Sequence, residues 1–332
     1  MELRQADGVA RQRDIAQALG VTEGMLIDAQ VDVSSTGVGR GLQARRLQGE
    51  HGDFGQLLSE LGRAGELTAV TRHAHCMHER TGVYELPGVY GDIGRAEADQ
   101  RLFYSHWVHG YAVRDGAQQS FQFFDAQGVA VHQVFAGAAT QMAAWQALCM
   151  RWVDANVGVD AEASRAGGPS LRGAQEFFGQ QRRHGLPRIR AMELVAPAFA
   201  QPVDRHAARV LLQGAATNGT PIMVLVGSPG VMQIHAGRIR RVEVAGPWLH
   251  VLDPRFSLHL REDAIAHAWA VRTPTADGLI SSLALYAQDG ELIAQFFGQR
   301  QPGQPERCAW RELLHAQVDD RAWREEAVGC AA

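Results

Sequence analysis

Short apolar runs bounded by Gly, Pro or Asp dominate the C-terminal part of the chain. They occupy residues 223–227, 231–235, 242–244, 249–252 and 257–260. Runs this short with turn residues between them are typical of antiparallel strands. Two longer runs, 279–287 and 292–297, flank Gln288-Asp289-Gly290, and an Asp-Gly pair is a strong hairpin signal. The pattern predicts an antiparallel meander followed by a β-hairpin.

Helical patterns occupy fewer places. They predict helices at residues 140–156, 170–184, 203–218 and 306–318. Ser170 is a suitable N-cap for the second of these, and Gly185 with Pro187 ends it. Residues 264–271 are compatible with a strand or a short helix.

Residues 13–29, RDIAQALGVTEGMLIDA, have the spacing of a helix-turn-helix. In a DNA-binding protein the second helix would enter the major groove. The alternative is a helical hairpin that packs on the first sheet. We favour the hairpin because the formal net charge is −4, and nucleic-acid binding usually needs a basic surplus.

Five segments of the first half recur in the same order in the second half. Met77 and Gly82 match Met232 and Gly237, and Trp145 matches Trp310. Between them, residues 109–113 match 267–271, residues 120–128 match 282–290, and residues 131–135 match 293–297. Ordered self-similarity of this kind indicates an internal duplication.

The expected fold class is therefore α+β, with two similar halves that each form a large antiparallel sheet with flanking helices. Residues 165–169, Arg-Ala-Gly-Gly-Pro, are the natural linker. The expected domains are an N-terminal repeat at residues 1–165 and a C-terminal repeat at residues 166–332.

Composition narrows the function classes. All 32 basic residues of the 332-residue chain are Arg, which excludes catalytic, Schiff-base or Walker-type lysines. The four cysteines are far apart, so neither a zinc ribbon nor a disulfide framework is expected. The polar N-terminus shows no signal peptide, and no apolar run approaches the roughly 18 residues of a membrane span. We expect a soluble, cytoplasmic protein without membrane insertion and without nucleic-acid binding.

Few local motifs indicate chemistry. His73 and His75 would share one face of a strand, with His78 outside that register, which is a weak metal site. His109 recurs as His267, which favours an architectural role for that pair. No GxSxG elbow is present, and the glycines at 37–41 and 166–168 lack the strand-to-helix context of a phosphate loop.

Five segments together resemble a known family. They are HERTGVYE (78–85), DQRLFYSHWVHGYAV (99–113), EFFGQQRRHGL (176–186), GTPIMVLVGSPGVMQIHAG (219–237) and AQFFGQRQPGQPE (294–306). They are similar to the cytoplasmic haem-trafficking proteins, or haemin-degrading factors, of bacterial haem-utilisation operons. The resemblance extends from about residue 11 to residue 318. It implies two repeated sheets with one haem b between them, held mainly by the C-terminal half.

The resemblance also implies a set of haem-binding residues. The family's distal arginine and its neighbouring aromatic residue match Arg101 and Phe103, and a propionate-side arginine matches Arg188. Near the C-terminal hairpin, the corresponding positions are Gln295, Phe297 and Arg300. Arginines suit propionates because the guanidinium binds a carboxylate through two parallel hydrogen bonds.

Two positions depart from the family pattern. The proximal histidine is replaced by Gln175, and a pocket lysine is replaced by Thr273. His184 lies nine residues beyond Gln175, about half a turn away around a regular helix, so it does not simply replace the ligand. Metal ligands and catalytic residues therefore stay unassigned. Water or hydroxide held by Arg101, or a histidine from elsewhere, would fill the axial position.

Three functions follow from the resemblance. The first is a carrier that takes haem from an inner-membrane importer to a haem oxygenase during haem-iron acquisition. The second is an enzyme on the same fold that cleaves haem reductively, in which the iron would supply the chemistry. The third is a paralogue that binds a different tetrapyrrole or only a protein partner.

Overall fold

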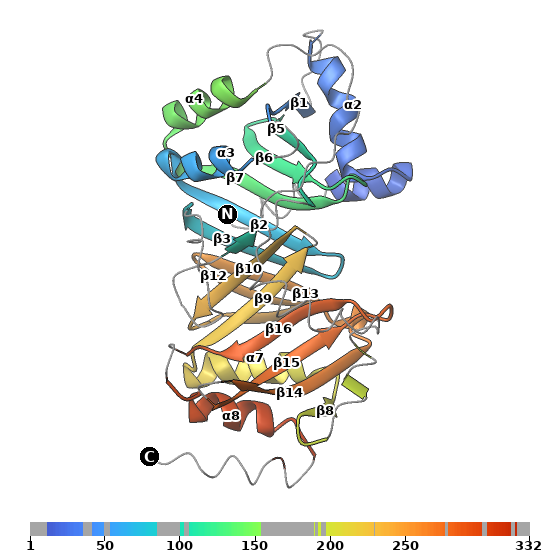
Figure 1. Cartoon of the computed structure of the whole chain (residues 1–332), viewed down its shortest axis with the longest axis vertical. Helices are drawn as coiled ribbons and strands as arrows, with labels where there is room; N and C mark the ends of the chain where they lie inside the picture. Colours follow the sequence, from blue (N-terminus) through green and yellow to red (C-terminus); the bar gives the residue numbers. More distant parts are fainter. Residues whose placement is uncertain are drawn as a thin grey trace.

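The computed structural model describes most of the chain, in two antiparallel sheets with helices on their outer faces. The residues described are 12–35, 42–49, 54–84, 100–102, 106–153, 189, 192–193, 197–228, 230–275, 278–300, 304–319 and 323. Figure 1 shows N-terminal elements at one end and C-terminal elements at the other, with β2, β3, β9, β10, β12 and β13 between them.

The larger sheet, called here the N-terminal sheet, has nine strands. All neighbouring strands are antiparallel. Their order is β1 (Leu42–Arg46), β5 (His109–Asp115), β6 (Gln118–Phe124), β7 (Ala130–Thr140), β2 (Gly65–His73), β3 (Cys76–Val83), β13 (Phe256–Arg261), β12 (Trp248–Asp253) and β11 (Val242–Ala245).

The C-terminal sheet has seven strands, which are also antiparallel throughout. Their order is β4 (Gln100–Leu102), β10 (Val231–Gly237), β9 (Ile222–Ser228), β16 (Leu292–Gly298), β15 (Gly278–Tyr286), β14 (His267–Thr275) and β8 (Ala200–Val203).

The strand orders confirm the duplication predicted from sequence. The run β1-β5-β6-β7-β2-β3-β13 in one sheet corresponds strand by strand to β8-β14-β15-β16-β9-β10-β4 in the other. The last strand of each run comes from the opposite half of the chain. Arg101 of β4 pairs with Met232, and His259 of β13 pairs with the equivalent Met77. The two halves thus exchange one strand each.

This exchange bears on the expected domains, residues 1–165 and 166–332. Each sheet contains strands from both sides of that boundary. The linker at 165–169 lies outside the described residues, so the boundary itself stays a prediction. The expected fold class is confirmed: both sheets are antiparallel, and helices flank them.

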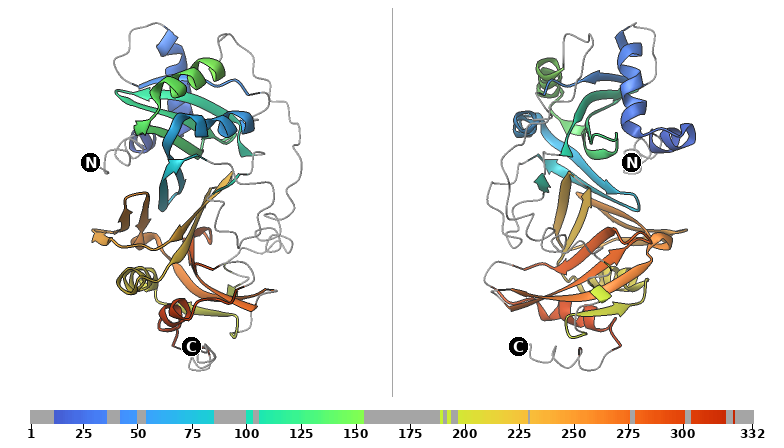
Figure 2. Two further views of the ribbon diagram at one scale, coloured as in Figure 1. Left: turned by 90° about the vertical axis from the view of Figure 1, so that its left-hand side faces the viewer. Right: turned by 45° about the vertical axis from the view of Figure 1, so that its right-hand side comes forward.

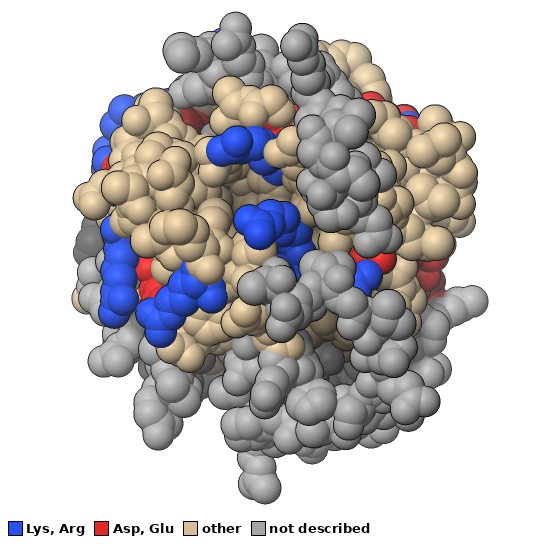
Figure 3. All heavy atoms as spheres, turned by 90° about the horizontal axis from the view of Figure 1, so that it is seen from above, with Lys and Arg blue, Asp and Glu red and all other residues tan. Residues whose placement is uncertain are grey.

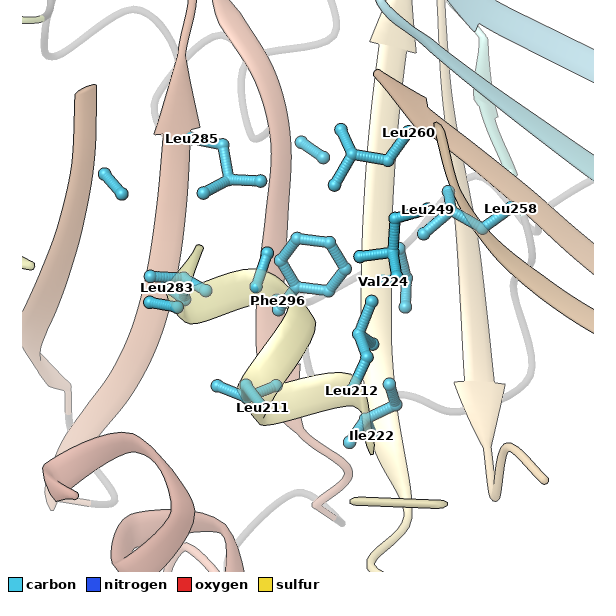
Figure 4. Packing of buried hydrophobic residues seen from close by; sticks show 14 of the residues in the cluster. Leu211, Leu212, Ile222, Val224, Leu249, Leu258, Leu260, Leu283, Leu285 and Phe296 are labelled. Carbon is cyan, nitrogen blue, oxygen red and sulfur yellow. The ribbon is translucent and has the colours of Figure 1, made fainter. Parts of the chain in front are cut away.

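Apolar helix faces cover one side of the C-terminal sheet. Helices α7 (Ala207–Asn218) and α8 (Cys308–His315) share one core with the inner strands. In Figure 4, Leu211 and Leu212 of α7 point toward Phe296 and Val224. Both helices lie on the same side of this sheet (Figure 2). The opposite side of the C-terminal sheet is therefore not covered by α7 or α8.

The N-terminal sheet has a corresponding outer layer. Helices α3 (Gly55–Glu60) and α4 (Met142–Trp152), with the 3₁₀ turn Leu61–Ala64, supply Leu57, Leu58 and Trp145 to its core. Trp145 and Trp310 are both fully buried, in α4 and α8 respectively. The predicted match between these tryptophans therefore extends to their surroundings.

The predicted helical hairpin on the first sheet is also confirmed. A helix over residues 12–19 ends at Gly20, whose φ of +68° lies in the left-handed region that glycine tolerates. Helix α2 (Glu23–Ser35) follows, and the Met25 backbone N–H donates to Thr22 Oγ1 at 3.3 Å. Ile27 and Val31 pack against the sheet, so the second helix buries its apolar side there.

Three predicted elements differ in detail. The expected meander divides: β9 and β10 join the C-terminal sheet, whereas β11, β12 and β13 join the N-terminal sheet. The helix expected from residue 203 begins at Ala207, because Val203 ends β8 and the Asp204 carboxylate accepts the His206 N–H in a turn. Residues 267–275 form β14. The helix predicted at 170–184 lies outside the described residues.

The cysteines also differ from expectation. Cys76 and Cys149 are free, but Cys308 is disulfide-bonded. The wide cysteine spacing predicts no disulfide framework, but it does not exclude a single disulfide, because spacing in sequence does not report proximity in space. Within the described part of the chain, no helix is long and apolar enough to cross a membrane.

Candidate functional site

The side of the C-terminal sheet that faces away from α7 and α8 carries two residues predicted from sequence. Side chains alternate along β16, so Phe296 joins the helix-side core while Gln295 and Phe297 lie on the opposite side. Phe297 packs there with other apolar side chains. We call this set the apolar face: Met223, Leu225, Met232, Ile234, Ala236, Ile280 and Phe297.

Strand register arranges these residues in rows, because directly opposed residues of an antiparallel pair share a face. One row across β15, β16, β9 and β10 reads Ser282, Phe297, Met223 and Ala236. The next row reads Ala284, Gln295, Leu225 and Ile234. Two polar side chains, Ser282 and Gln295, thus lie in the plate formed by these two rows, whose other members are apolar.

Gln295 is the distinctive polar group of this plate. Gln295 is 6% exposed, and its Nε2 donates to Ser282 Oγ at 3.0 Å. Its Oε1 is buried and has no hydrogen-bond partner in the described part of the chain. A buried acceptor without a partner costs about 1–3 kcal/mol, so the atom is suited to a donor that a ligand would bring.

A small pocket of about 280 Å³ lies at the β8–β14 edge of the same sheet. It is lined by Met192, Phe199, Ala200, Val271, Arg272, Thr273 and Pro274. Thr273, the position of the family lysine, is exposed and pairs with Ile280 of the apolar face. The pocket is smaller than most ligand sites, so we regard it as the rim of the plate.

The arginine next to Thr273 does not supply the missing cation. Arg272 is buried on the helix side, where its Nη2 donates to the Trp323 carbonyl at 2.6 Å and lies 3.3 Å from His315 Nε2. Its guanidinium also stacks on the Trp323 ring at 3.9 Å. Burial and then the charges of Arg272 and Arg311 lower the pKa of His315 to about 4, so this imidazole is neutral near pH 7.

The remaining predicted residues are placed unevenly. Arg101 lies in β4, the strand beside β10, where it pairs with Met232 of the apolar face. Arg300 follows the end of β16 by two residues and is partly buried. Phe103, Gln175 and Arg188 lie outside the described residues. The structure therefore brings Gln295, Phe297 and the backbone position of Arg101 onto one sheet.

Sequence reasoning missed most of the apolar face. Met223, Leu225, Met232 and Ile234 were recognised only as strand residues. Their period of two along 222–228 and 231–237 was the available signal, since it assigns alternate residues to opposite sides of a strand. Ser282 was noted as the repeat of Ser120 but not as a partner for Gln295.

The histidine patch needs a correction. His73 and His75 do not share one strand: β2 ends at His73, β3 begins at Cys76, and His75 lies in the turn between them. The local alternation was misread because a two-residue turn interrupts it. His78 is fully buried, and burial is the main cause that lowers its pKa. Among the described residues, no group of three or more His, Cys, Asp or Glu could hold a metal ion.

Exposed positive charge gathers elsewhere on the molecule. Figure 3 shows arginines around a hollow at the end that carries α2, α4 and β1 in Figure 1. Exposed arginines on elements at this end include Arg45 and Arg46 of β1, Arg114 of β5 and Arg151 of α4. This charge belongs to the N-terminal sheet and its helices, not to the apolar face.

Comparison with protein families assigns both halves of the chain. Residues 185–317 match a model described as the haemin-degrading HemS.ChuX domain, and residues 45–148 match one described as haem utilisation ChuX/HutX. Haemin transport protein HmuS of Yersinia pestis is 35% identical over 327 residues, which cover 91% of each chain. Haemin transport protein HemS of Yersinia enterocolitica is 34% identical, with the same coverage.

Solved structures agree with this assignment. The chain matches PhuS of Pseudomonas aeruginosa, a haem-binding protein, with a TM-score of 0.78 and 36% identity, over 95% of this chain and 96% of PhuS. It matches ChuS, a haem oxygenase of E. coli, with a TM-score of 0.79 and 33% identity, over 92% of this chain and 95% of ChuS.

Proposed function

The chain belongs to the family of haemin-transport and haemin-degrading proteins that includes HmuS and HemS, and from this premise we propose that it binds haem against the apolar face of its C-terminal sheet. The observation that carries the proposal is the apolar plate with one orphaned acceptor, Gln295 Oε1, in a chain of this family. Haem handling in iron acquisition is the role that this site would serve.

The composition of the apolar face supports a large, flat ligand. Met223, Leu225 and Phe297 present aliphatic, thioether and aromatic surface in adjacent positions on neighbouring strands. Burial of apolar surface contributes roughly 25 cal/mol per Å², so a macrocycle covering several of these side chains gains several kcal/mol. Methionines adapt their shape to a ligand surface more easily than branched residues do.

Polar groups at the edges of the plate would orient the ligand. Arg300 lies two residues beyond the end of β16, and Arg101 lies in β4, which pairs with β10 at the edge of the apolar face. Arg188 is the third arginine implied by the family resemblance. Their guanidinium groups would pair with the propionates. Gln295 Oε1 would accept a hydrogen bond from a bound water or from a polar group at the edge of the ligand. Oε1 is available for this because the other end of the amide, Nε2, donates to Ser282. When bound, haem would supply a redox-active iron.

The residue that would bind the iron is where this chain departs from the family pattern. By the resemblance, Gln175 stands where the family has a histidine, and an amide is a weaker ligand for ferric iron than neutral imidazole. Arg101 would instead hold a water or hydroxide near the iron. Gln175→His should bind haem more tightly, and its absorption spectrum should be that of six-coordinate low-spin haem. An unchanged spectrum would place Gln175 away from the iron.

A carrier role is the function best supported, because both curated relatives are named haemin transport proteins. It requires a donor and an acceptor of haem, for which we propose an inner-membrane importer and a haem oxygenase in the cytoplasm. Haem transfer from this protein to an oxygenase, followed by the decay of its Soret band, would test the delivery step.

The direct test of the site is a haemin titration. Wild-type protein should give a saturable one-to-one Soret shift, and Phe297→Ala and Arg300→Ala should each weaken binding by about tenfold, ~1.4 kcal/mol. Arg63→Ala is the matched control, because Arg63 is exposed in the 3₁₀ turn Leu61–Ala64 on the other sheet. No saturable shift would contradict the haem proposal and favour another tetrapyrrole or a protein partner.

Haem degradation is the second candidate, because the structural relative ChuS is a haem oxygenase. The haem-loaded protein should lose its Soret band and release iron when a reductant and oxygen are added, with catalase present to remove free peroxide. A stable spectrum under these conditions would leave transport as the function of this chain.

A further inference from the structure

Two histidines face each other on the outer part of the N-terminal sheet. His250 of β12 and His259 of β13 are directly paired in register, and their Nδ1 atoms lie 2.7 Å apart. Their ring centroids are 4.9 Å apart, with the rings at 72° to each other. Two ring nitrogens that point at one another at this distance share either a proton or a metal ion.

The surroundings of the pair continue in the same row across the sheet. Glu243 of β11 lies opposite His250, and Met77 of β3 lies opposite His259. The Trp248 ring is nearly parallel to that of His250, at 6.4 Å. The row therefore places a thioether, which is a metal-binding group, beside His259, and an ion-paired carboxylate beside His250.

Nearby cations are already neutralised. The Arg241 Nε donates to Glu243 Oε1 at 2.6 Å, with both side chains about half exposed. Arg72 lies opposite Met77 on β2, and its guanidinium is paired with Glu23. The described residues of this row thus present no unpaired positive charge to a cation that approaches His250.

Both imidazoles can act as ligands through Nδ1. At 2.7 Å the two Nδ1 atoms share one proton, and transfer of that proton to Nε2 would leave a lone pair on each Nδ1, directed into the space between the rings. His250 is partly exposed, which gives an ion a route to the pair.

We propose that His250 and His259 bind a divalent transition-metal ion through their Nδ1 atoms, with Cu²⁺ preferred. Two nitrogen ligands at about 2.0–2.1 Å from a metal and at right angles are about 2.9 Å apart, close to the observed separation. A right angle matches the tetragonal geometry of Cu²⁺ and Ni²⁺, and Cu²⁺ binds nitrogen ligands most tightly in the divalent series. Water would complete the coordination. The site lies on the sheet that does not carry the proposed haem face.

The experiment uses the full, tag-free, haem-free chain and Cu²⁺ as the probe. Calorimetric titration should show one ion per chain, and the electron paramagnetic resonance spectrum should show hyperfine structure from two nitrogens. His250→Ala should weaken binding at least tenfold and remove one nitrogen. His259→Gln should do the same, and circular dichroism would establish that both variants are folded. His267→Ala, an exposed histidine of β14, is the matched control.

A second measurement needs no variant: Cu²⁺ should protect His250 of the wild-type chain from modification by diethyl pyrocarbonate. Wild-type affinity and spectrum in His250→Ala would overturn the proposal, as would an ion held at His73 and His75 instead. Haem affinity should be equal in His250→Ala and the wild type, so the proposed metal site and the proposed haem site are tested independently.

Discussion

The equivalent faces of the two sheets begin from the same residues and diverge. On the N-terminal sheet, Phe135 pairs with Ser120, as Phe297 pairs with Ser282 on the C-terminal sheet. Gln133 likewise takes the place of Gln295. Beside it, however, stands Gln122 rather than Ala284. The duplicated scaffold kept one set of side chains and changed their neighbours.

The changed neighbours decide what each face contacts. Gln133 Nε2 donates to Gln122 Oε1 at 2.9 Å, and Gln122 Nε2 donates to Ser120 Oγ at 3.1 Å and to Gln12 Oε1 at 3.2 Å. The N-terminal face is thus a hydrogen-bonded ladder closed by a residue of the first helix. In the C-terminal face, the positions of Gln122, Thr68 and Glu79 hold Ala284, Met223 and Ile234. The position of Thr81 likewise holds Ala236. These polar-to-apolar differences turn a polar face, on which Gln133 Oε1 is itself without a partner among the described residues, into one suited to an apolar ligand.

The largest expected effect tests whether the halves are one cooperative unit. Trp145→Ala and Trp310→Ala each remove a fully buried indole that donates a hydrogen bond, to Gln119 Oε1 and to the Ser281 carbonyl respectively. Each should lower the free energy of unfolding by about 3–5 kcal/mol. Because β4 and β13 are exchanged between halves, urea should unfold either variant in one transition. Two transitions, with only one shifted, would show that the halves unfold separately.

Glu79 gives the next largest effect, through pH. Burial raises the pKa of this carboxyl to about 7, from an ordinary value of 4.5. The folded state therefore binds the proton more tightly, and stability falls as pH rises from about 4.5 to about 7. Glu79→Gln should raise the free energy of unfolding at pH 8 by on the order of 1–3 kcal/mol and leave it unchanged at pH 4.

Urea titrations at both pH values measure this effect, and Glu243→Gln is the control because Glu243 is exposed. An equal effect of Glu79→Gln at pH 4 and pH 8 would show that the carboxyl is not buried as a neutral acid.

A smaller effect should follow from building the N-terminal ladder into the C-terminal face. In Ala284→Gln, the new Oε1 can accept a hydrogen bond from Gln295 Nε2, as Gln122 Oε1 accepts one from Gln133 Nε2 in the other half. Haem affinity should fall about tenfold, ~1.4 kcal/mol, because a polar amide replaces apolar surface on the face that would contact the ligand. The haemin titration measures this, with Ala139→Gln, at an exposed position of β7, as the control. Unchanged affinity would place the ligand elsewhere.

The smallest effect compares two equivalent hairpin glycines. Gly128 and Gly290 have φ angles of +77° and +81°, so alanine at either costs about 1 kcal/mol in backbone strain. A Cβ at Gly128 would in addition overlap Thr22 Oγ1, whereas one at Gly290 would lie 3.0 Å from Ile189 Cγ2. Gly128→Ala should therefore lower the melting temperature more than Gly290→Ala. The reverse order would contradict the packing of the α2 turn on this hairpin.

Sequence periodicity predicted much of this fold for a definable reason. Strands such as 222–228, 231–237 and 292–298 are bounded by turn residues, and the repeat of residues 131–135 at 293–297 fixed their equivalence. The exchange of β4 and β13 was not predictable. A strand of three residues, Gln100–Leu102, has no readable period, and pairing partners are decided by contacts distant in sequence.

The candidate site was predictable only in part. Gln295 and Phe297 came from the family resemblance, and the structure places both on the apolar face. Met223 and Ile234 carry no chemical signature as single residues. Their role becomes visible only when strand register aligns the two sheets, because Met223 then corresponds to Thr68 and Ile234 to Glu79.

The most direct test of the haem proposal exchanges one aligned pair between the sheets. Ile234→Glu gives the C-terminal face the carboxyl of the N-terminal one, and Glu79→Ile does the reverse. In a haemin titration followed in the Soret region, Ile234→Glu should lose about a hundredfold in affinity, ~2.7 kcal/mol, while Glu79→Ile should bind as the wild type does. Wild-type affinity in Ile234→Glu, or loss in Glu79→Ile alone, would contradict the assignment of haem to the apolar face.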